Sequence, residues 1–412
     1  MDHGFFRVIS PQRFCELLAA FDPVDELTTG LDVCLDRILA SDVVAPENIP
    51  AVDRSCMDGY AVRAADTFGA SEGNPAYVEL LHSAAIDEIV TRPVGPGECT
   101  GIATGGTLPP GADAVLMVEH TQMLGPTTVE IRRSVTPGEN VMLRGEDVTA
   151  GEIALRAGTR LRPQEVGLLA ALGHVWVPVF CQPCCGVIST GDELVPVEST
   201  PRPGQIRDVN SHTLAGLLRQ AGAKVVNYGL VPDERKALRD VLTRALAEND
   251  AVFISGGSSI GTRDLTIEVL ESLHDSEILA HGVSISPGKP TILARVGGKP
   301  VMGLPGQVTS AQVVMLVFGQ PLVRHLNGLP DAFDPGRRQT RSAVLGANVS
   351  SKPGREDYVR VRLEMHDGQL MAMPRLGKSG LLRTMLEADG LIRLDSSLEG
   401  MTAGQPVAVW LL

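Results

Sequence analysis

The sequence lacks the long apolar run that a membrane-spanning helix needs. Its longest apolar stretches are short or interrupted. They are 168–180 and 313–323, broken by His174, Gly319 and Gln320. The first residues also lack a basic segment followed by an apolar run. We therefore expect a soluble, cytoplasmic protein without an export signal or a membrane partner.

The sequence also lacks an excess of positive charge. It has 36 Lys and Arg against 49 Asp and Glu, which gives a net charge of −13. A field of this sign repels nucleic acid and anionic membrane surfaces, but a net charge does not exclude a local basic pocket. We therefore expect neither nucleic acid nor membrane as a partner.

Cysteine and histidine are too few and too scattered to define a catalytic or metal centre. The seven cysteines cannot all pair within one chain, which favours a reducing compartment. Cys181, Cys184 and Cys185 include a C-x-x-C spacing, but no second Cys/His pair follows at zinc-site distance. Buried or bystander thiols are therefore favoured over a structural zinc. The nine histidines are dispersed, and the sequence context of none marks it as a base.

At 412 residues the chain exceeds the size at which one hydrophobic core stops growing, so we expect several domains. The pattern predicts an α/β multidomain protein with a three-layer α/β domain around a parallel sheet. A helical linker domain, an inserted β domain and a C-terminal β-barrel-like domain complete it. The predicted boundaries are 1–45 with 145–180 for the linker, 46–144 for the insert, 181–329 for the α/β domain and 330–412 for the C-terminal domain.

Apolar strands alternate with amphipathic helices from Cys185 to Leu326, which is typical of a parallel sheet covered on both faces. The predicted strands are 186–189, 224–231, 251–255 and 300–304, and the predicted helices are 211–220, 234–247, 264–273 and 309–325. Helical spacing also predicts helices that open at Ser10 and Pro11, that span 31–40 and that span 162–172. Alternating or short extended runs predict strands at 60–62, 114–118, 128–131, 358–363, 391–394 and 406–412.

Glycines, carboxylates and hydroxyls follow the four predicted parallel strands, where ligands bind in such sheets. The segments are Thr190–Glu193, Pro232–Glu234, Ser255–Gly261 and Pro305–Gln307. The backbone amides of Ser255–Gly261 and the N-terminus of the helix after it could hold a phosphate. This segment is neither a Walker A nor a dinucleotide motif. Carboxylates beside a phosphate imply a divalent cation, and Mg²⁺ prefers oxygen ligands. Glu193 and Asp264 are the candidate ligands.

Each of these features also has an ordinary structural interpretation. Asp233 and Asp264 are suitable helix N-terminal residues, and the glycine pair 256–257 could be only a sharp exit from a strand. Lys289, in a rigid Ser-Pro-Gly-Lys-Pro turn, could be a solvated lysine. Asp58 and Thr104 lie in turns of the predicted β insert that are individually weak signals. The accumulation of four such loops at one sheet edge favours a functional site.

Taken together, the motifs resemble those of the molybdopterin molybdenumtransferase family. The resemblance covers essentially the whole chain, with the motifs in the expected order. They are Ser-Cys-Met-Asp-Gly-Tyr-Ala at 55–61, Thr-Gly-Asp-Glu-Leu at 190–194, Ser-Gly-Gly at 255–257, Ser-Pro-Gly-Lys-Pro at 286–290 and Gly-Leu-Pro-Gly at 303–306. It implies insertion of molybdate into adenylylated molybdopterin, with release of AMP, by a homodimer whose site lies between subunits. It also implies a molybdopterin adenylyltransferase and molybdoenzyme clients or their chaperones as partners.

The resemblance assigns roles by motif position. Asp58, Asp147, Glu193, Asp233 and Asp264 become the catalytic candidates, with Mg²⁺ held by Glu193 and Asp264. The substrate-binding candidates are Thr104, Ser255, Gly256, Gly257, Lys289, Ser310, Arg355 and Ser379. Cleavage of a phosphoanhydride-like bond needs charge neutralisation and alignment more than a strong nucleophile, so these residue types suit it.

The chain departs from the family pattern beside the expected oxyanion site. Gly282 and Ser286 stand where basic residues are common, and Gln307-Val308 replaces Asn-Pro. In the glycine loop, Ser258 replaces a valine and Thr262 an acidic residue. An alternative function is therefore a non-catalytic or client-specific carrier, insertase or scaffold for the finished cofactor. An unrelated phosphosugar or nucleotide enzyme is a third alternative.

Overall fold

The computed structural model describes residues 8–256 and 260–412, with the side chains of 260–264 left undescribed. The chain forms two compact units. The larger comprises Met1–Thr28, Arg37–Ala40 and Pro178–Leu412, and the smaller comprises Thr29–Asp36 and Ser41–Val177. Within the described ranges, no helix is long and apolar enough to cross a membrane.

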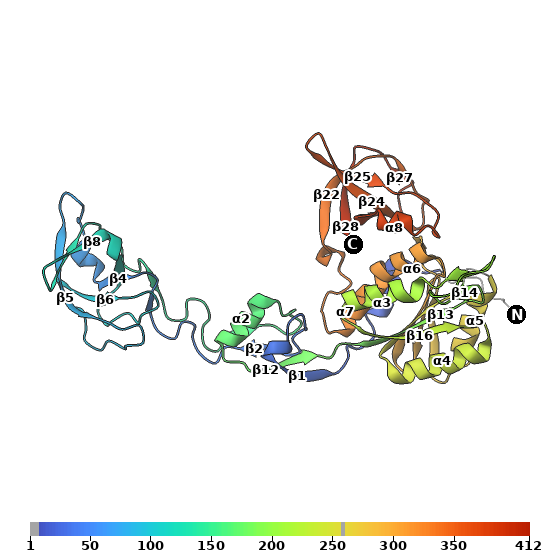
Figure 1. Ribbon diagram of the computed structural model, residues 1–412, viewed down its shortest axis with the longest axis horizontal. Coiled ribbons are helices and arrows are strands. Elements are labelled where there is room, and N and C mark those ends of the chain that lie inside the picture. Colours follow the sequence, from blue (N-terminus) through green and yellow to red (C-terminus); the bar gives the residue numbers. More distant parts are fainter. Residues whose placement is uncertain (1–7, 257–259) are drawn as a thin grey trace. The chain divides into compact units, whose positions relative to one another are not determined.

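A six-stranded sheet of order β16-β13-β17-β21-β20-β18 is the middle layer of the α/β domain (Figure 1). The four predicted strands form its parallel part. They are β16 (Lys224–Val231), β13 (Cys184–Thr190), β17 (Ala251–Ser255) and β21 (Lys299–Leu304). Sequence reasoning missed the antiparallel edge, β20 (Ile292–Val296) and β18 (Ser276–His281). The hairpin from β20 to β21 turns through Gly297 and Gly298, whose φ values of 55° and 80° suit glycine.

Helices cover both faces of this sheet, which confirms the predicted three layers. One face carries α1 (Pro11–Leu18), α3 (Asn210–Gln220), α6 (Val308–Val314) and α7 (Gln320–Leu326), and the other carries α4 (Arg235–Glu248) and α5 (Ile260–Glu271). Consecutive residues of β13 face opposite layers, because Val187 packs in the core with Leu214 whereas Ile188 packs with Leu242. A π-helical turn, η4 (Met315–Gly319), joins α6 to α7.

The predicted helix at 31–40 is wrong. Only the turn η1 (Leu31–Val33) is helical there. Leu39 instead forms an antiparallel bridge with Val179 in β12 (Trp176–Phe180), and the Ala40 amide donates to the Pro178 carbonyl over 3.0 Å. Pairing with a distant strand therefore overrides the helical spacing of this segment.

The C-terminal domain is a closed barrel of five strands. These are β22 (Thr340–Leu345), β24 (Glu356–His366), β25 (Gln369–Pro374), β26 (Gly390–Leu394) and β28 (Pro406–Leu411), closed by the pairing of β24 with β26. A short strand of the α/β domain, β19 (Ile285–Ser286), pairs in parallel with the start of β24. The barrel and the α/β domain are thereby joined by backbone hydrogen bonds.

The insert is a β domain, as predicted, and it is built on a six-stranded sheet. Its order is β7 (Ala114–Met117), β4 (Gly59–Val62), β6 (Glu98–Ile102), β5 (Ala76–Ser83), β9 (Thr128–Ile131) and β8 (Thr121–Leu124). The entering and leaving chain segments pair as two short ladders, and α2 follows them. In one ladder β2 (Val43–Val44) pairs with β11 (Ile153–Leu155), and in the other β3 (Arg54–Ser55) pairs with β10 (Val141–Met142). The helix α2 spans Pro163–Ala171.

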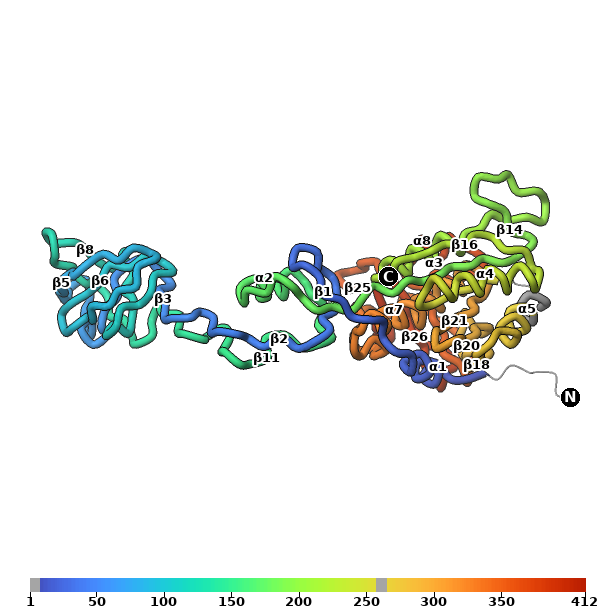
Figure 2. Tube along the Cα trace, turned by 90° about the horizontal axis from the view of Figure 1, so that it is seen from below, coloured from blue at the N-terminus to red at the C-terminus, as the bar shows by residue number. Residues whose placement is uncertain are grey.

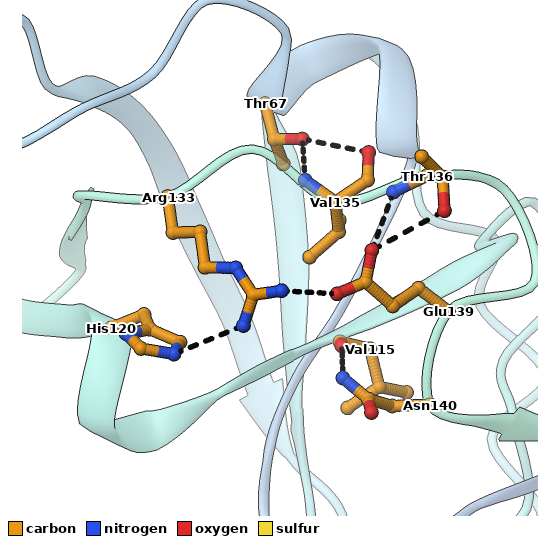
Figure 3. Close-up of polar contacts among 8 residues, drawn as sticks. All are labelled: Thr67, Val115, His120, Arg133, Val135, Thr136, Glu139 and Asn140. Carbon is orange, nitrogen blue, oxygen red and sulfur yellow. Dashed lines mark hydrogen bonds and ion pairs between the residues drawn. The ribbon is translucent and has the colours of Figure 1, made fainter.

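Polar contacts tie the segment after β9 across the insert (Figure 3). The Val135 amide donates to Thr67 Oγ1 over 3.0 Å, and Arg133 pairs with Glu139 at 3.0 Å. The Asn140 side chain donates to the Val115 carbonyl over 2.9 Å. The same segment leads into β10, which pairs with β3, and from β3 the chain runs into the turn that carries the Asp58 motif.

The remaining elements are short strands and helical turns. They are β1 (Glu26–Gly30), η2 (Ala64–Thr67), η3 (Val118–His120), β14 (Leu194–Val195), β15 (Ile206–Arg207), η5 (Pro335–Arg337), β23 (Val349–Ser350), α8 (Arg383–Leu386) and β27 (Gly400–Met401). Figure 2 shows the loop between β14 and β15 projecting from the α/β domain.

Candidate functional site

A pocket of about 550 Å³ lies where the α/β domain meets the C-terminal barrel. The α/β domain contributes the Ser-Pro-Gly-Lys turn and the start of α6, and the barrel contributes the turn before β24. The lining residues are Val8, Ser284–Pro290, Ser310, Lys352–Arg355 and Ser379. Four of the predicted substrate-binding residues are thus brought together: Lys289, Ser310, Arg355 and Ser379.

The pocket lining is cationic and rich in hydroxyls. It holds Lys289, Lys352 and Arg355, together with four serines, and its described residues include no carboxylate. Two of the three cations come from the barrel. Hydroxyl and cationic donors without competing carboxylates are the chemistry that binds an oxyanion.

The turn that presents Lys289 is held rigidly from behind. The Lys289 carbonyl accepts from the Val283 amide over 2.9 Å, and the hydroxyl of buried Thr291 donates to the Gly288 carbonyl over 2.7 Å. Gly288 has φ +118°, and a Cβ there would lie 2.5 Å from a methyl group of Val314 in α6. Glycine is therefore needed for the turn to lie against the helix that carries Ser310.

Backbone bonds fix the barrel side of the pocket against the α/β side. Ser286 is registered opposite Asp357 in the ladder between β19 and β24. The Thr309 amide at the start of α6 donates to the Ser379 carbonyl over 3.0 Å. Residues distant in sequence therefore meet through main-chain contacts that do not depend on the side chains lining the pocket.

At the carboxyl edge of the parallel sheet, Asp233 is held by neighbouring loops. Its Oδ1 accepts from the Thr190 hydroxyl over 2.6 Å, and its amide donates to Asp192 Oδ1 over 3.1 Å. The residue at the N-terminal boundary of α4 is Glu234, which makes no side-chain capping bond. The structural interpretation of Asp233 as the helix cap is therefore wrong, whereas its catalytic role stays a prediction.

Glu193 and Ser255 lie at the same edge in different settings. The Glu193 carboxylate lies against the Gly191 backbone, since a Cβ on Gly191 would sit 2.8 Å from Glu193 Oε2. Ser255 is buried, and its hydroxyl accepts from the Asn210 side chain over 2.6 Å. Ser255 therefore has no exposed hydroxyl for a substrate, and Gly256 follows it directly at the end of β17.

Of the two predicted Mg²⁺ ligands, Glu193 and Asp264, the structure describes the side chain of Glu193 only. Gly257 and the Asp264 side chain lie outside the described residues, so their predicted roles stay predictions. The described part of the chain contains no group of three or more carboxylate, histidine or cysteine ligands. Mg²⁺ needs only one or two carboxylates when substrate phosphates and water complete its octahedron, so Glu193 suits it as a partial donor.

The insert candidates lie in the smaller unit. Asp58 Oδ1 accepts from the Thr104 amide over 2.7 Å and from the Thr104 hydroxyl over 2.9 Å. These two bonds, the amide first, lower the pKa of Asp58, which keeps it ionised. Asp147 is exposed, and its amide donates to the Ile49 carbonyl over 3.0 Å. Thr104 thus positions the Asp58 carboxylate.

Sequence reasoning missed two residues at these sites. Lys352 lines the pocket but lies in a turn of no recognisable motif, and only its spacing from Arg355 could have suggested it. Buried Asn210 at the start of α3 donates to Ser255 and to the Gly306 carbonyl, and its Oδ1 has no partner among the described residues. Its position after a short strand and at a helix start was the available signal.

Comparison with known proteins gives a consistent identification. Residues 9–173 match the MoeA N-terminal region (domain I and II), 186–325 a probable molybdopterin binding domain, and 342–412 the MoeA C-terminal region (domain IV). A molybdopterin molybdenumtransferase 2 of Mycobacterium tuberculosis is 35% identical over 96% of both chains. A molybdopterin molybdenumtransferase of Bacillus subtilis is 32% identical over 93% of this chain and 89% of its own.

The likeness extends to a solved structure. A crystal structure of the molybdopterin biosynthesis moeA protein from Pyrococcus horikoshii superposes with a TM-score of 0.79 at 34% identity, over 98% of this chain and 99% of that one. The three matched regions, the relatives and the fold agree with the motifs and the cationic pocket. This chain belongs to the molybdopterin molybdenumtransferase (MoeA) family.

Proposed function

We propose that this protein inserts molybdate into adenylylated molybdopterin and releases AMP. The observation that carries the proposal is the pocket of about 550 Å³ lined by three cations and four serines and by no described carboxylate. Family membership supplies the reaction class. A tetrahedral oxyanion needs such donors, and the molybdopterin-binding region supplies the α/β side of the same pocket.

Side chains in the pocket would hold the oxyanion, and acidic side chains at the sheet edge would orient the adenylyl group. Lys289 and Arg355 neutralise the oxyanion, and Ser310 and Ser379 donate hydroxyl hydrogen bonds to it. Gly256, at the end of β17, lets the backbone approach a phosphate closely. Asp233, restrained by Thr190, faces the neighbouring loops at the end of β13.

Mg²⁺ is part of this proposal. Glu193 would hold the ion, with Asp264 as the second predicted carboxylate, and the bound cation would supply charge neutralisation at the phosphate. Bare carboxylates at this edge would otherwise repel an anionic substrate, which supports the assignment.

The assembly, partners and location belong to the same proposal. We propose a cytoplasmic homodimer in which Asp58, Thr104 and Asp147 of one subunit complete the site of the other. A molybdopterin adenylyltransferase would supply the substrate, and molybdoenzymes or their chaperones would receive the product. Asp58, Thr104 and Asp147 belong to the smaller compact unit, and the other candidates belong to the larger one.

The test is AMP release from adenylylated molybdopterin with Mg²⁺, measured with and without molybdate. We expect AMP release that saturates with molybdate and falls strongly in Lys289→Gln.

Uncharged Ser286 in the pocket favours the alternative function of a cofactor carrier. Tight binding of finished cofactor with no AMP release above buffer would contradict the transferase and support the carrier.

A further inference from the structure

Two lysines from different domains line the pocket. Lys289 is presented by the turn after β19, and Lys352 by the turn between β23 and β24. Both side chains are exposed. Because the domains are joined through the β19–β24 ladder, the two turns are fixed relative to each other.

The charge of Arg355 in this pocket is already partly compensated. Its guanidinium Nη2 lies 3.1 Å from Asp357 Oδ1, and its Nε donates to Asp357 Oδ2 over 3.2 Å. Lys352, three residues earlier, forms no ion pair or hydrogen bond with any residue in the described part of the chain. Its positive charge is therefore available to a ligand.

The backbone under Lys352 is anchored on both sides. The Ser351 amide donates to the Glu399 carbonyl over 2.7 Å, and the Gly354 amide donates to the Ser396 carbonyl over 2.8 Å. Gly354 has φ +86°, which closes the turn. A fixed backbone reduces the ordering cost when the lysine side chain engages an anion.

We propose that Lys352 is a direct ligand of the oxyanion and that it acts with Lys289 as a pair of cations from two domains that matches a tetrahedral dianion. This inference rests on the proposed function of the pocket. Lys352 thereby supplies, from the barrel, positive charge that uncharged Ser286 does not supply from the α/β turn.

Equilibrium dialysis of inorganic molybdate against the full-length protein tests the assignment. We expect Lys352→Gln to weaken binding about tenfold, the range for a lost hydrogen bond to a charged group. Lys352→Arg should retain most of the affinity because it keeps the charge. Lys236→Gln removes an exposed lysine from α4, outside the pocket, and should bind like the wild type. Added salt should reduce the difference in molybdate affinity between the wild type and Lys352→Gln, because Lys352 is exposed and its charge is screened.

Two results would overturn the assignment, and they are distinguishable. If Lys352→Gln binds molybdate like the wild type while Lys289→Gln binds weakly, Lys352 is not a ligand and the proposed function stands. If the wild type binds no molybdate and releases no AMP, the proposed function fails and the assignment of Lys352 fails with it.

Discussion

The guanidinium of Arg355 and the carboxylate of Asp357 form a two-point ion pair at the pocket edge, with Nη2 3.1 Å from Oδ1 and Nε 3.2 Å from Oδ2. The Ser351 hydroxyl donates to the same Oδ2. Asp357 is buried whereas Arg355 is partly exposed. The carboxylate therefore restrains the Arg355 guanidinium at the pocket, and we expect it to act as a positioning group for Arg355.

Removing the charge of Asp357 should loosen Arg355 without removing it. We expect Asp357→Asn to raise the half-saturating molybdate concentration about fivefold, with a smaller change in the maximal rate of AMP release, because a poorly aligned ion pair loses part of its binding energy. The measurement is a molybdate titration of AMP release. The control is Glu364→Gln, which breaks the ion pair with Arg375, 2.9 Å long, on the same barrel but outside the pocket. Equal effects of the two variants would contradict a positioning role.

Adding a charge at Ser286 should strengthen oxyanion binding. Ser286 is half-buried in the pocket lining, so Ser286→Lys should lower the half-saturating molybdate concentration by about tenfold, in the range of a charge-assisted hydrogen bond. The gain should shrink with added salt. An unchanged or higher half-saturation, measured beside the wild type, would show that the oxyanion is held elsewhere.

Asp58 and Glu193 lie in different compact units, which allows a complementation test of the proposed homodimer. Asp58→Asn and Glu193→Gln should each be nearly inactive alone. After subunit exchange, heterodimers would contain one intact site, and a mixture in equal amounts should recover about a quarter of wild-type AMP release. If exchange is demonstrated and no activity returns, each site is built within one chain.

Glu165 makes the stability of the smaller unit depend on pH. The Arg162 side chain, which donates to its carboxylate over 2.6 Å, lowers the pKa of Glu165 from 4.5 to about 2. A lowered pKa in the folded state contributes stability above pH 4.5 that is lost as the pH falls toward 2. We expect Glu165→Gln to cost about 1 kcal/mol at pH 7, after allowance for solvent screening of the pair, and less at pH 3, which lies between the unfolded and the folded pKa of Glu165.

Urea unfolding at the two pH values checks this expectation. The matched control is Glu16→Gln, which breaks the pair between Glu16 and Arg13 at the same i,i+3 spacing in α1, where both side chains are about half exposed. That change should cost less than about 0.5 kcal/mol at either pH. A Glu165→Gln penalty that is equal at pH 7 and pH 3 would contradict the assignment.

The fold was predictable where a local pattern decides the structure. The parallel strands are continuous apolar runs, and buried β17 was predicted with its observed bounds, 251–255. The helix at 31–40 failed because Leu39 pairs with Val179, a contact that helical spacing does not encode. Strand β18 was missed because Ser276, Glu277 and His281 interrupt its apolar pattern.

The candidate site was predictable only where a residue belongs to a motif or is assigned by the family resemblance. Lys289 and Arg355 are separated by more than sixty residues in sequence, and the β19–β24 ladder that joins their domains is a two-residue pairing without a sequence signature. Lys352 lies in the turn just before β24, so the β19–β24 ladder brings it to the pocket. The sequence gives no sign of this pairing, and Lys352 was therefore missed. The family resemblance assigned Ser310 and Ser379 to substrate binding, and both residues line the same pocket.

The most direct test of the central claim is a single-turnover reaction in which AMP and metal-bound molybdopterin are quantified together. The wild-type protein, loaded with adenylylated molybdopterin and given Mg²⁺ and molybdate, should release one AMP for each molybdenum that becomes bound to the pterin. AMP release without molybdenum in the product, or full retention of the adenylylated substrate, would contradict molybdate insertion by this protein.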